Sequence, residues 1–264
     1  MDIYISSLAG ILRPLKSFVV KAANEGFRNI EIIDDWSHRL NSGKIKELIE
    51  LGKSYSLKYL VHAPFDGINI STPQPSLRRT SLKLIERSIR KAHKIEAKLV
   101  VVHSGFKSPF DYFRPKTTWS IFLDVLKFIN RIASDLDVYI GIENMPSNAF
   151  ALIHSHKDAM ILLDEIGSSL ERIRLTLDVG HSNTISNDEI KKFLLSLGHY
   201  VIHVHVHDNK GENDDHLPIG SGNIDWRMFV DMIKGLKLIG GLTLEVMSIR
   251  DAKKSLKLLT RLLG

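Results

Sequence analysis

Residues 201–208 read Val-Ile-His-Val-His-Val-His-Asp, and this alternation of apolar and imidazole side chains predicts a β-strand. Since successive side chains of a strand point to opposite faces, His203, His205 and His207 share one face while Val204 and Val206 share the other. Amphipathic stretches of helical period flank this strand on both sides. Helices packed on the valine face would turn the histidines to the interior of a barrel. His205 is then the best placed ligand of the three, whereas His203 lies deeper and His207 lies at the rim.

The same unit, a short apolar run followed by a longer amphipathic stretch, repeats along the whole chain. The runs predict eight strands, at residues 3–5, 29–33, 57–62, 99–103, 138–143, 173–178, 201–207 and 241–246. The stretches predict eight helices, at residues 14–25, 44–54, 76–95, 117–136, 157–166, 187–197, 225–236 and 251–263. Asn187 and Asp225 suit N-caps, because their side-chain oxygens can accept from the free N–H groups of a first helical turn.

Eight units of about 30 to 40 residues, with no linker rich in glycine, serine or proline, predict a (β/α)8 TIM barrel. This barrel forms a single domain over residues 1–264. The alternative is a doubly wound open sheet, which usually carries a glycine-rich phosphate-binding turn after an early strand. Neither GxGxxG nor GxxxxGK[ST] occurs in the chain, so the closed barrel is favoured.

The composition, with 44% hydrophobic and 25% charged residues, is that of an ordinary folded domain. The chain has no cysteine, so any metal site must use nitrogen and oxygen ligands, and a reducing cytoplasm is the expected location. No apolar run approaches the roughly 20 residues that span a bilayer, and the first residues carry no targeting signal, so we expect no membrane partner. The net charge of +6 is spread over the chain and is compatible with a phosphorylated or nucleic-acid partner.

Potential metal ligands and acid–base groups stand where six consecutive predicted strands end. They are His62, His103, Glu143, Asp178, His205 and Glu245. The ends of parallel barrel strands meet at one rim, where barrel active sites are built. Three carboxylates and three imidazoles are costly to bury there without a counter-charge, and a divalent cation supplies one. The pattern therefore predicts a metal centre, and ligands of this kind are compatible with zinc, manganese, cobalt or iron.

Two further motifs add candidate residues. His181 stands three residues after Asp178 in Asp-Val-Gly-His, where it is either a metal ligand or a substrate contact. Asp214 and His216 lie in the long loop after the seventh strand. The alternative for that loop is a polar surface turn that ends on Asp225 as an N-cap.

The motifs so far described share one order along the chain. They are Val-His-Ala-Pro at 61–64, His-Ser-Gly at 103–105, Ile-Glu-Asn at 142–144, Leu-Asp-Val-Gly-His at 177–181, His-Val-His-Asp at 205–208, Asp-Asp-His at 214–216, Gly-Ser-Gly at 220–222 and Leu-Glu-Val at 244–246. In this set the chain resembles the xylose isomerase-like TIM barrel superfamily. That superfamily includes sugar and sugar-phosphate isomerases and epimerases together with endonuclease IV.

For an isomerase or epimerase, the resemblance implies one divalent metal ion, zinc, manganese or cobalt, held by Glu143, Asp178, His205 and Glu245. The ion acts as a Lewis acid and stabilises the enediolate that forms after proton abstraction next to a carbonyl. The implied catalytic residues are Glu143 and Glu245, which move protons on opposite faces, and His181, which orients substrate oxygens. The main prediction is therefore a metal-dependent isomerase or epimerase of a small sugar or sugar-derived acid. No feature of the sequence predicts an oligomeric state.

Resemblance to endonuclease IV implies up to three zinc ions and the additional ligands His62, His103, His181, Asp214 and His216. The alternative function is a zinc-dependent apurinic/apyrimidinic-site endonuclease acting on DNA, which the positive charge fits. Aromatic and basic residues at 106–116 fit either a nucleic-acid surface or a lid over a small substrate. Two departures favour the isomerase. Residues 144–148 replace a Thr/Ala-Gly-Gln-type segment of endonuclease IV, and Phe65 stands where that enzyme has tyrosine.

Overall fold

The computed structural model describes residues 1–264, and its eight strands form one closed parallel barrel in the order β1-β2-β3-β4-β5-β6-β7-β8. The strands are β1 (Ile3–Ser6), β2 (Asn29–Ile33), β3 (Lys58–His62), β4 (Leu99–His103), β5 (Tyr139–Glu143), β6 (Ile173–Asp178), β7 (Val201–Val206) and β8 (Gly241–Leu244). The barrel closes where β1 pairs with β8, for example with Ile5 opposite Leu244. The predicted (β/α)8 barrel is therefore confirmed.

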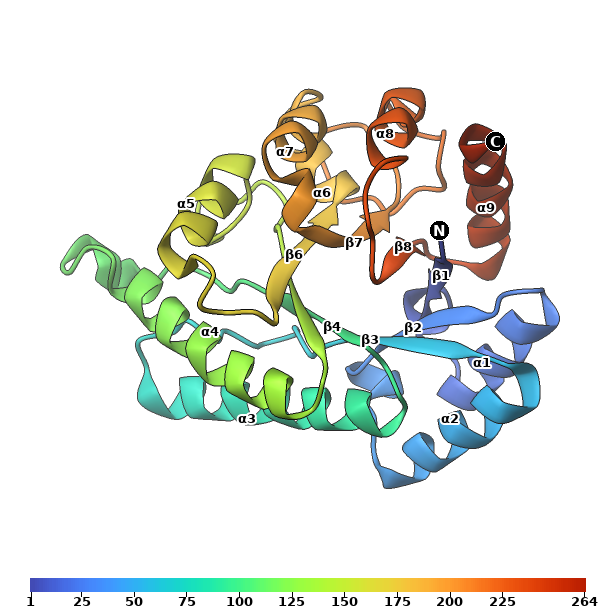
Figure 1. Ribbon diagram of the computed structural model, residues 1–264, viewed down its shortest axis with the longest axis horizontal. Coiled ribbons are helices and arrows are strands. Elements are labelled where there is room, and N and C mark those ends of the chain that lie inside the picture. The colour runs from blue at the N-terminus through green and yellow to red at the C-terminus, as the bar shows by residue number, and fades with distance from the viewer.

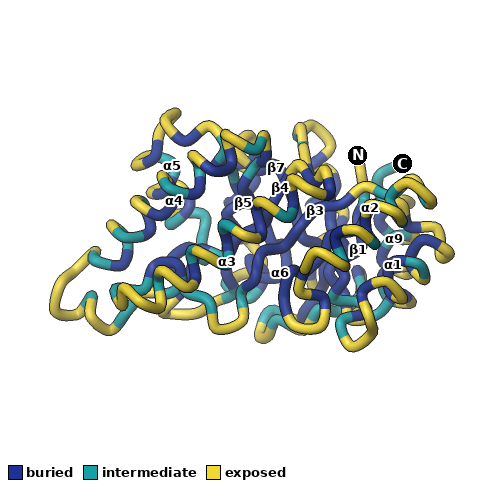
Figure 2. The backbone as a smooth tube through the Cα atoms, turned by 90° about the horizontal axis from the view of Figure 1, so that it is seen from below, coloured by how far each residue is buried: buried dark blue, intermediate teal, exposed yellow.

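Helices surround the strands, and the two ends of the chain lie side by side near α9 (Figures 1 and 2). The helices are α1 (Leu15–Asn24), α2 (Ser42–Tyr55), α3 (Pro75–Lys94), α4 (Thr117–Asp135), α5 (His156–Ile166), α6 (Val179–Asn183), α7 (Glu189–Leu197), α8 (Trp226–Ile233) and α9 (Ile249–Leu263). Short 3-10 helices occupy Ser7–Gly10, Trp36–His38, Pro109–Tyr112 and Gly198–Tyr200. None of the helices combines the length and apolar composition that crossing a bilayer requires.

Alternation in β7 explains how the barrel separates its apolar layer from its polar interior. Val204 and Val206 belong to the main hydrophobic core, together with helical residues such as Phe193 and Phe229. The histidines of the opposite face are fully buried as well. Figure 2 shows the burial of the whole chain, with buried strands in the middle and exposed residues on the outer sides of the helices. The helices thus cover the apolar layer, while the inward faces of the strands carry both these polar side chains and a small apolar cluster that includes Leu60, Leu99 and Val101.

The structure corrects two details of the sequence analysis. Asn187 is not an N-cap, because α7 begins at Glu189, whose N–H already donates to the carbonyl oxygen of Ser186. The short α6 was not predicted, since five residues are too few to show a helical period. The cap at Asp225 is confirmed, because its side chain accepts from the N–H groups of residues 227 and 228.

Candidate active site

Four side chains from neighbouring strands converge where the strands end. Glu143 ends β5, Asp178 ends β6, His205 lies in β7 and Glu245 follows β8. The Nδ1 atom of His205 lies 3.0 Å from Oε1 of Glu143, 3.2 Å from Oε2 of Glu245 and 3.6 Å from Oδ2 of Asp178. All four residues are buried, and one ligand atom from each lies within 4.8 Å of the others. We refer to these four residues as the quartet, and their spacing allows them to share one cation.

Strand register places these groups together. His103 lies opposite Glu143 in the β4–β5 pair, and Asp178 lies opposite His205 in the β6–β7 pair. Asn144 joins the ends of β5 and β6, because its side chain donates to the carbonyl oxygen of Asp178 at 3.1 Å and accepts from the N–H of Asp178 at 2.8 Å. The two carboxylates of β5 and β6 are therefore fixed by the backbone that carries them.

Two more imidazoles approach Glu143 from β3 and β4. The Nε2 atoms of His62 and His103 lie 3.2 and 3.1 Å from Oε2 of Glu143, which is the oxygen that does not face His205. The Nδ1 atom of His62 donates to the carbonyl oxygen of Ala63 at 2.9 Å, which leaves Nε2 directed at the carboxylate. Glu143 therefore lies between the quartet and this second pair of potential ligands.

A third cluster forms around Asp214. The Oδ2 atom of Asp214 lies 3.2 Å from Nε2 of His181 and 3.2 Å from Nε2 of His216. The Nδ1 atoms of His181 and His216 each donate to a backbone carbonyl oxygen at 2.8 Å. In many metal sites, a backbone carbonyl that accepts from one ring nitrogen orients the other ring nitrogen toward the metal ion. All nine residues predicted as ligands therefore lie in one contiguous polar region.

The loop that carries Asp214 and His216 is held in place by Asp208. This buried carboxylate accepts from the N–H of Gly220 at 2.8 Å and from Nε1 of Trp226 at 2.9 Å. The loop thus brings Asp214 and His216 to the site, and it also ends on Asp225 as the N-cap of α8.

Two buried residues near the quartet were not assigned a role from the sequence. His207 is fully buried, and its Nε2 atom lies 3.1 and 3.2 Å from the two oxygens of Asp178. Gly180 leaves room for this ring, because an added Cβ at that position would overlap it. Glu31 in β2 is also fully buried and contacts His205. A charged residue flanked by isoleucines within a predicted strand was the available signal for Glu31.

The electrostatics of these clusters are set by burial and by opposite charges. Burial raises the pKa of the Glu143 carboxyl, but the positive charge of His205 outweighs it and holds the pKa well below its ordinary value. Burial lowers the pKa of His205, but Glu245 and other carboxylates raise it well above its ordinary value. Burial also lowers the pKa of His216, while its hydrogen bond to Asp214 brings it to about 9. Protons thus supply the counter-charge that a divalent cation would otherwise provide.

The residues fit a divalent metal ion. The quartet offers three carboxylates and one imidazole, a donor set that suits manganese, cobalt or zinc. In the third cluster, Oδ1 of Asp214 is buried without a hydrogen-bond partner, as is Nδ1 of His207. Buried polar atoms are normally satisfied, so unpartnered ones beside a ligand cluster favour a bound cation.

An aromatic wall borders the metal-ligand region. Phe65 stacks on His103 with ring centroids 5.0 Å apart, and Trp36 meets Phe65 edge-on at 4.9 Å. Trp36 is 46% exposed, and its Nε1 atom donates to Oδ2 of Asp66 at 2.9 Å. An apolar surface beside charged groups is typical of small-molecule sites, where it packs against the carbon skeleton of a ligand.

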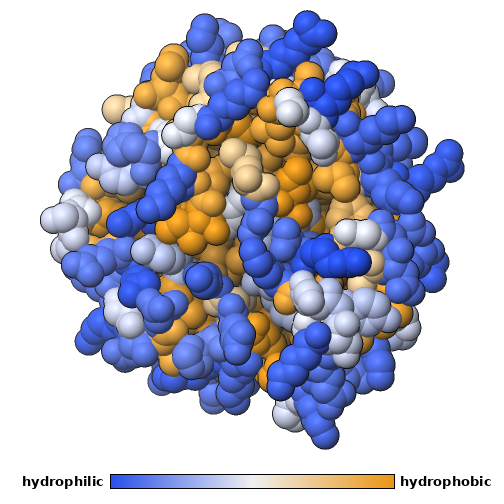
Figure 3. Space-filling model, turned by 45° about the vertical axis from the view of Figure 1, so that its right-hand side comes forward, coloured by the Kyte–Doolittle hydropathy of each residue, from blue (hydrophilic) through white to orange (hydrophobic).

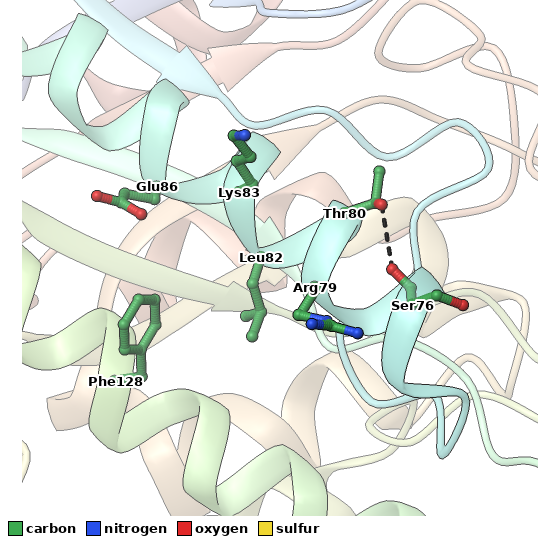
Figure 4. A pocket seen from close by; sticks show the side chains of 7 residues that line it. All are labelled: Ser76, Arg79, Thr80, Leu82, Lys83, Glu86 and Phe128. Atoms are coloured by element: carbon green, nitrogen blue, oxygen red, sulfur yellow. Dashed lines mark hydrogen bonds between the residues drawn. The ribbon is translucent and has the colours of Figure 1, made fainter.

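The structure also contains a surface groove outside the ligand clusters. A groove of about 740 Å³ between α3 and α4 is lined by seven residues, six of them on α3, as Figure 4 shows. It contains none of the predicted site residues. Apolar side chains also gather toward the middle of the face in Figure 3, with hydrophilic side chains around them. Neither feature replaces the barrel end as the candidate site.

The chain belongs to the xylose isomerase-like TIM barrel family, whose model matches residues 19–262. A solved structure described as a D-tagatose 3-epimerase-like protein superposes with a TM-score of 0.92, at 32% identity, covering 100% of this chain and 97% of that one. The uncharacterised protein MJ1311 of Methanocaldococcus jannaschii is 32% identical over 268 residues, which cover 98% of this chain and 88% of that protein.

More distant relatives fall into two functional groups. A D-psicose 3-epimerase of Ruminiclostridium cellulolyticum is 21% identical over 234 residues, covering 87% of this chain and 77% of that protein. A probable endonuclease 4 of Mycobacterium leprae is 27% identical over 192 residues, covering 69% of this chain and 71% of that protein. The epimerase-like neighbours support an isomerase or epimerase, as predicted from the sequence.

Proposed function

We propose that this protein is a divalent-metal-dependent sugar epimerase or isomerase. The observation that carries the proposal is the approach of two buried carboxylates, Glu143 and Glu245, to the same imidazole nitrogen of His205, at 3.0 and 3.2 Å. These carboxylates come from β5 and from the end of β8, with β6 and β7 between them in the barrel. They therefore reach the site from different directions, which an epimerase needs to move protons at two faces of one carbon.

The proposed chemistry is proton transfer next to a carbonyl. The quartet would hold the metal ion, which would supply positive charge at the substrate oxygens next to the reacting carbon. One glutamate accepts the proton from the substrate carbon, and the other returns a proton to the opposite face of that carbon. Which glutamate acts first depends on the substrate configuration. His181, whose Nε2 atom faces Asp214 in the third cluster, orients substrate oxygens by hydrogen bonding.

The proposed substrate is a small free carbohydrate. A metal ion held by the quartet would bind its oxygen atoms, while Phe65 and Trp36 pack against its carbon skeleton. Ketoses such as D-psicose and D-tagatose are the first to test, because the names of a relative and of a similar structure refer to these sugars. The test is epimerisation of each sugar by protein loaded with Mn²⁺, Co²⁺ or Zn²⁺. If no combination of these sugars and metals gives turnover, the proposal is contradicted.

A second candidate function is favoured by one observation, the two additional clusters around Glu143 and Asp214. Together with the quartet they provide nine ligands, enough for the three zinc ions of an apurinic/apyrimidinic-site endonuclease. Under this alternative, zinc would serve hydrolysis of a DNA phosphodiester. Incision of duplex DNA at an abasic site by zinc-loaded protein is the test. The cytoplasmic location stays a prediction under both functions.

A further inference from the structure

A buried hydrogen-bond network lies on the side of the His205 ring that faces away from the three carboxylates of the quartet. Oε1 of Glu31 lies 3.1 Å from Nε2 of His205, and Oε2 of Glu31 lies 2.9 Å from Nε2 of His203. The hydroxyl of Thr243 donates to Oε2 of Glu31 at 2.6 Å. All four side chains are fully buried. They come from β2, β7 and β8, so the network spans the barrel interior.

The chemistry of the network determines which nitrogen of His205 carries the proton and which one offers a lone pair to the metal centre. An ionised carboxylate only accepts hydrogen bonds, so the ring nitrogen that faces Glu31 must be the donor. His205 therefore carries a proton on Nε2, and in its neutral form Nδ1 keeps a free lone pair. That lone pair points toward Glu143 and Glu245.

His205 is oriented differently from three of the other four potential imidazole ligands. His62, His181 and His216 each donate from Nδ1 to a backbone carbonyl and present Nε2 to the site. His205 presents Nδ1 instead, and its orienting group is the side chain of Glu31. A side chain, unlike a backbone carbonyl, can be changed by mutation.

Glu31, His203 and His205 lie close enough together to share a cation, but the oxygens of Glu31 already have protein partners. Oε2 of Glu31 already accepts from the Thr243 hydroxyl and lies at hydrogen-bond distance from His203, while Oε1 faces His205. Each oxygen thus has a protein donor, in contrast to the unpartnered Oδ1 of Asp214.

We infer that Glu31 is a positioning residue, which holds His205 with Nδ1 directed at the metal centre and thereby strengthens metal binding. Carboxylates that fix a histidine ligand commonly change metal affinity about 10- to 100-fold when they are removed. This inference rests on the proposed metal centre but does not depend on the identity of the sugar.

The experiment compares Glu31→Gln with Asp34→Asn. Glutamine keeps the size of Glu31 but replaces one accepting oxygen with an NH2 group, so one imidazole loses its acceptor. Asp34 is a matched control, because it is also a fully buried carboxylate just after β2 but is paired with Lys91 at 2.9 Å. The readouts are the Kd for Mn²⁺, measured by competition with a chelator, and the visible spectrum of bound Co²⁺.

We expect Glu31→Gln to raise the Kd about 10- to 100-fold and to alter the Co²⁺ spectrum, while Asp34→Asn stays close to wild type in both. If folded Glu31→Gln binds Mn²⁺ as tightly as Asp34→Asn does, the inference is wrong even though the metal centre stands. If the wild type binds no divalent ion, the proposed function fails and takes this inference with it.

A second pair of variants covers the case in which Glu31→Gln does not fold. Thr243→Val removes the hydroxyl that holds Glu31, whereas Thr243→Ser retains it. We expect Thr243→Val to weaken Mn²⁺ binding and Thr243→Ser to bind Mn²⁺ as tightly as the wild type. Equal Kd values for these two variants would overturn the inference.

Discussion

Glu245→Gln tests the quartet by removing one carboxylate while keeping the size of the side chain. Glu245 is 6% exposed, and its Oε2 atom lies 3.2 Å from Nδ1 of His205. The neutral amide is a poorer metal ligand and does not accept a proton from a substrate carbon. We expect the variant to fold, to bind Mn²⁺ weakly and to lose about 10²- to 10⁴-fold in turnover, the usual contribution of a general acid or base.

The loss of metal binding has a calculable effect on thermal stability. In the wild type, an ion at 100 times its Kd adds about 2.7 kcal/mol to the free energy of unfolding. Each kcal/mol raises Tm by about 2 to 4 °C in a chain of this size, so the ion should raise Tm by about 5 to 10 °C. If Glu245→Gln binds 100-fold more weakly, the same ion concentration equals its Kd and adds only about 0.4 kcal/mol, or about 1 to 2 °C.

The assay is thermal unfolding followed by circular dichroism, with Mn²⁺ and with EDTA. Glu189→Gln is a matched control, because Glu189 is also a buried glutamate paired with a histidine, His156 at 2.8 Å, but belongs to none of the ligand clusters. Glu189→Gln should lower Tm under both conditions and keep the full metal-induced rise. A rise of the same size in Glu245→Gln and in the wild type would refute the assignment of Glu245 as a ligand.

Three further predictions concern pH, metal content and DNA. In metal-free protein, the free energy of unfolding should fall as pH increases from about 6.5 to about 9. The reason is that His216, with its pKa of about 9, keeps a proton in the folded protein that the unfolded chain releases. Urea unfolding across this range measures the change, and a free energy of unfolding that increases with pH would contradict the prediction. Protein loaded with excess Zn²⁺ and then desalted should contain one tightly held ion per chain by elemental analysis, whereas three would favour the endonuclease. Binding to DNA should be weak, should decrease with salt and should not depend on an abasic site, as the net charge of +6 alone predicts. Cleavage of DNA at an abasic site that Asp214→Ala abolishes would instead establish the second function.

The barrel and most of the candidate site were predictable because they depend on local patterns. The alternation in β7 identified the inward face, and polar residues at the ends of parallel strands had to meet at one rim. The expected cluster of Glu143, Asp178, His205 and Glu245 was therefore within reach of sequence reasoning, and the structure brings these residues together.

The residues that sequence reasoning missed depend on contacts between distant parts of the chain. Glu31 meets His203 and His205 across separations of 172 and 174 residues, and no local pattern encodes that pairing. The burial of His207 depends on the space that Gly180 leaves beside β7. The role of Asp208 appears only once the loop after β7 has folded around its carboxylate.

The most direct test of the account is turnover in heavy water. Protein loaded with Mn²⁺ is incubated with D-psicose or D-tagatose in D₂O, and the sugars are analysed by NMR and mass spectrometry. In the proposed mechanism the proton on each glutamate exchanges at least partly with solvent, so the account predicts an epimerised sugar with deuterium at the carbon next to the carbonyl. Epimerisation that retains the original hydrogen at that carbon would contradict proton transfer through Glu143 and Glu245.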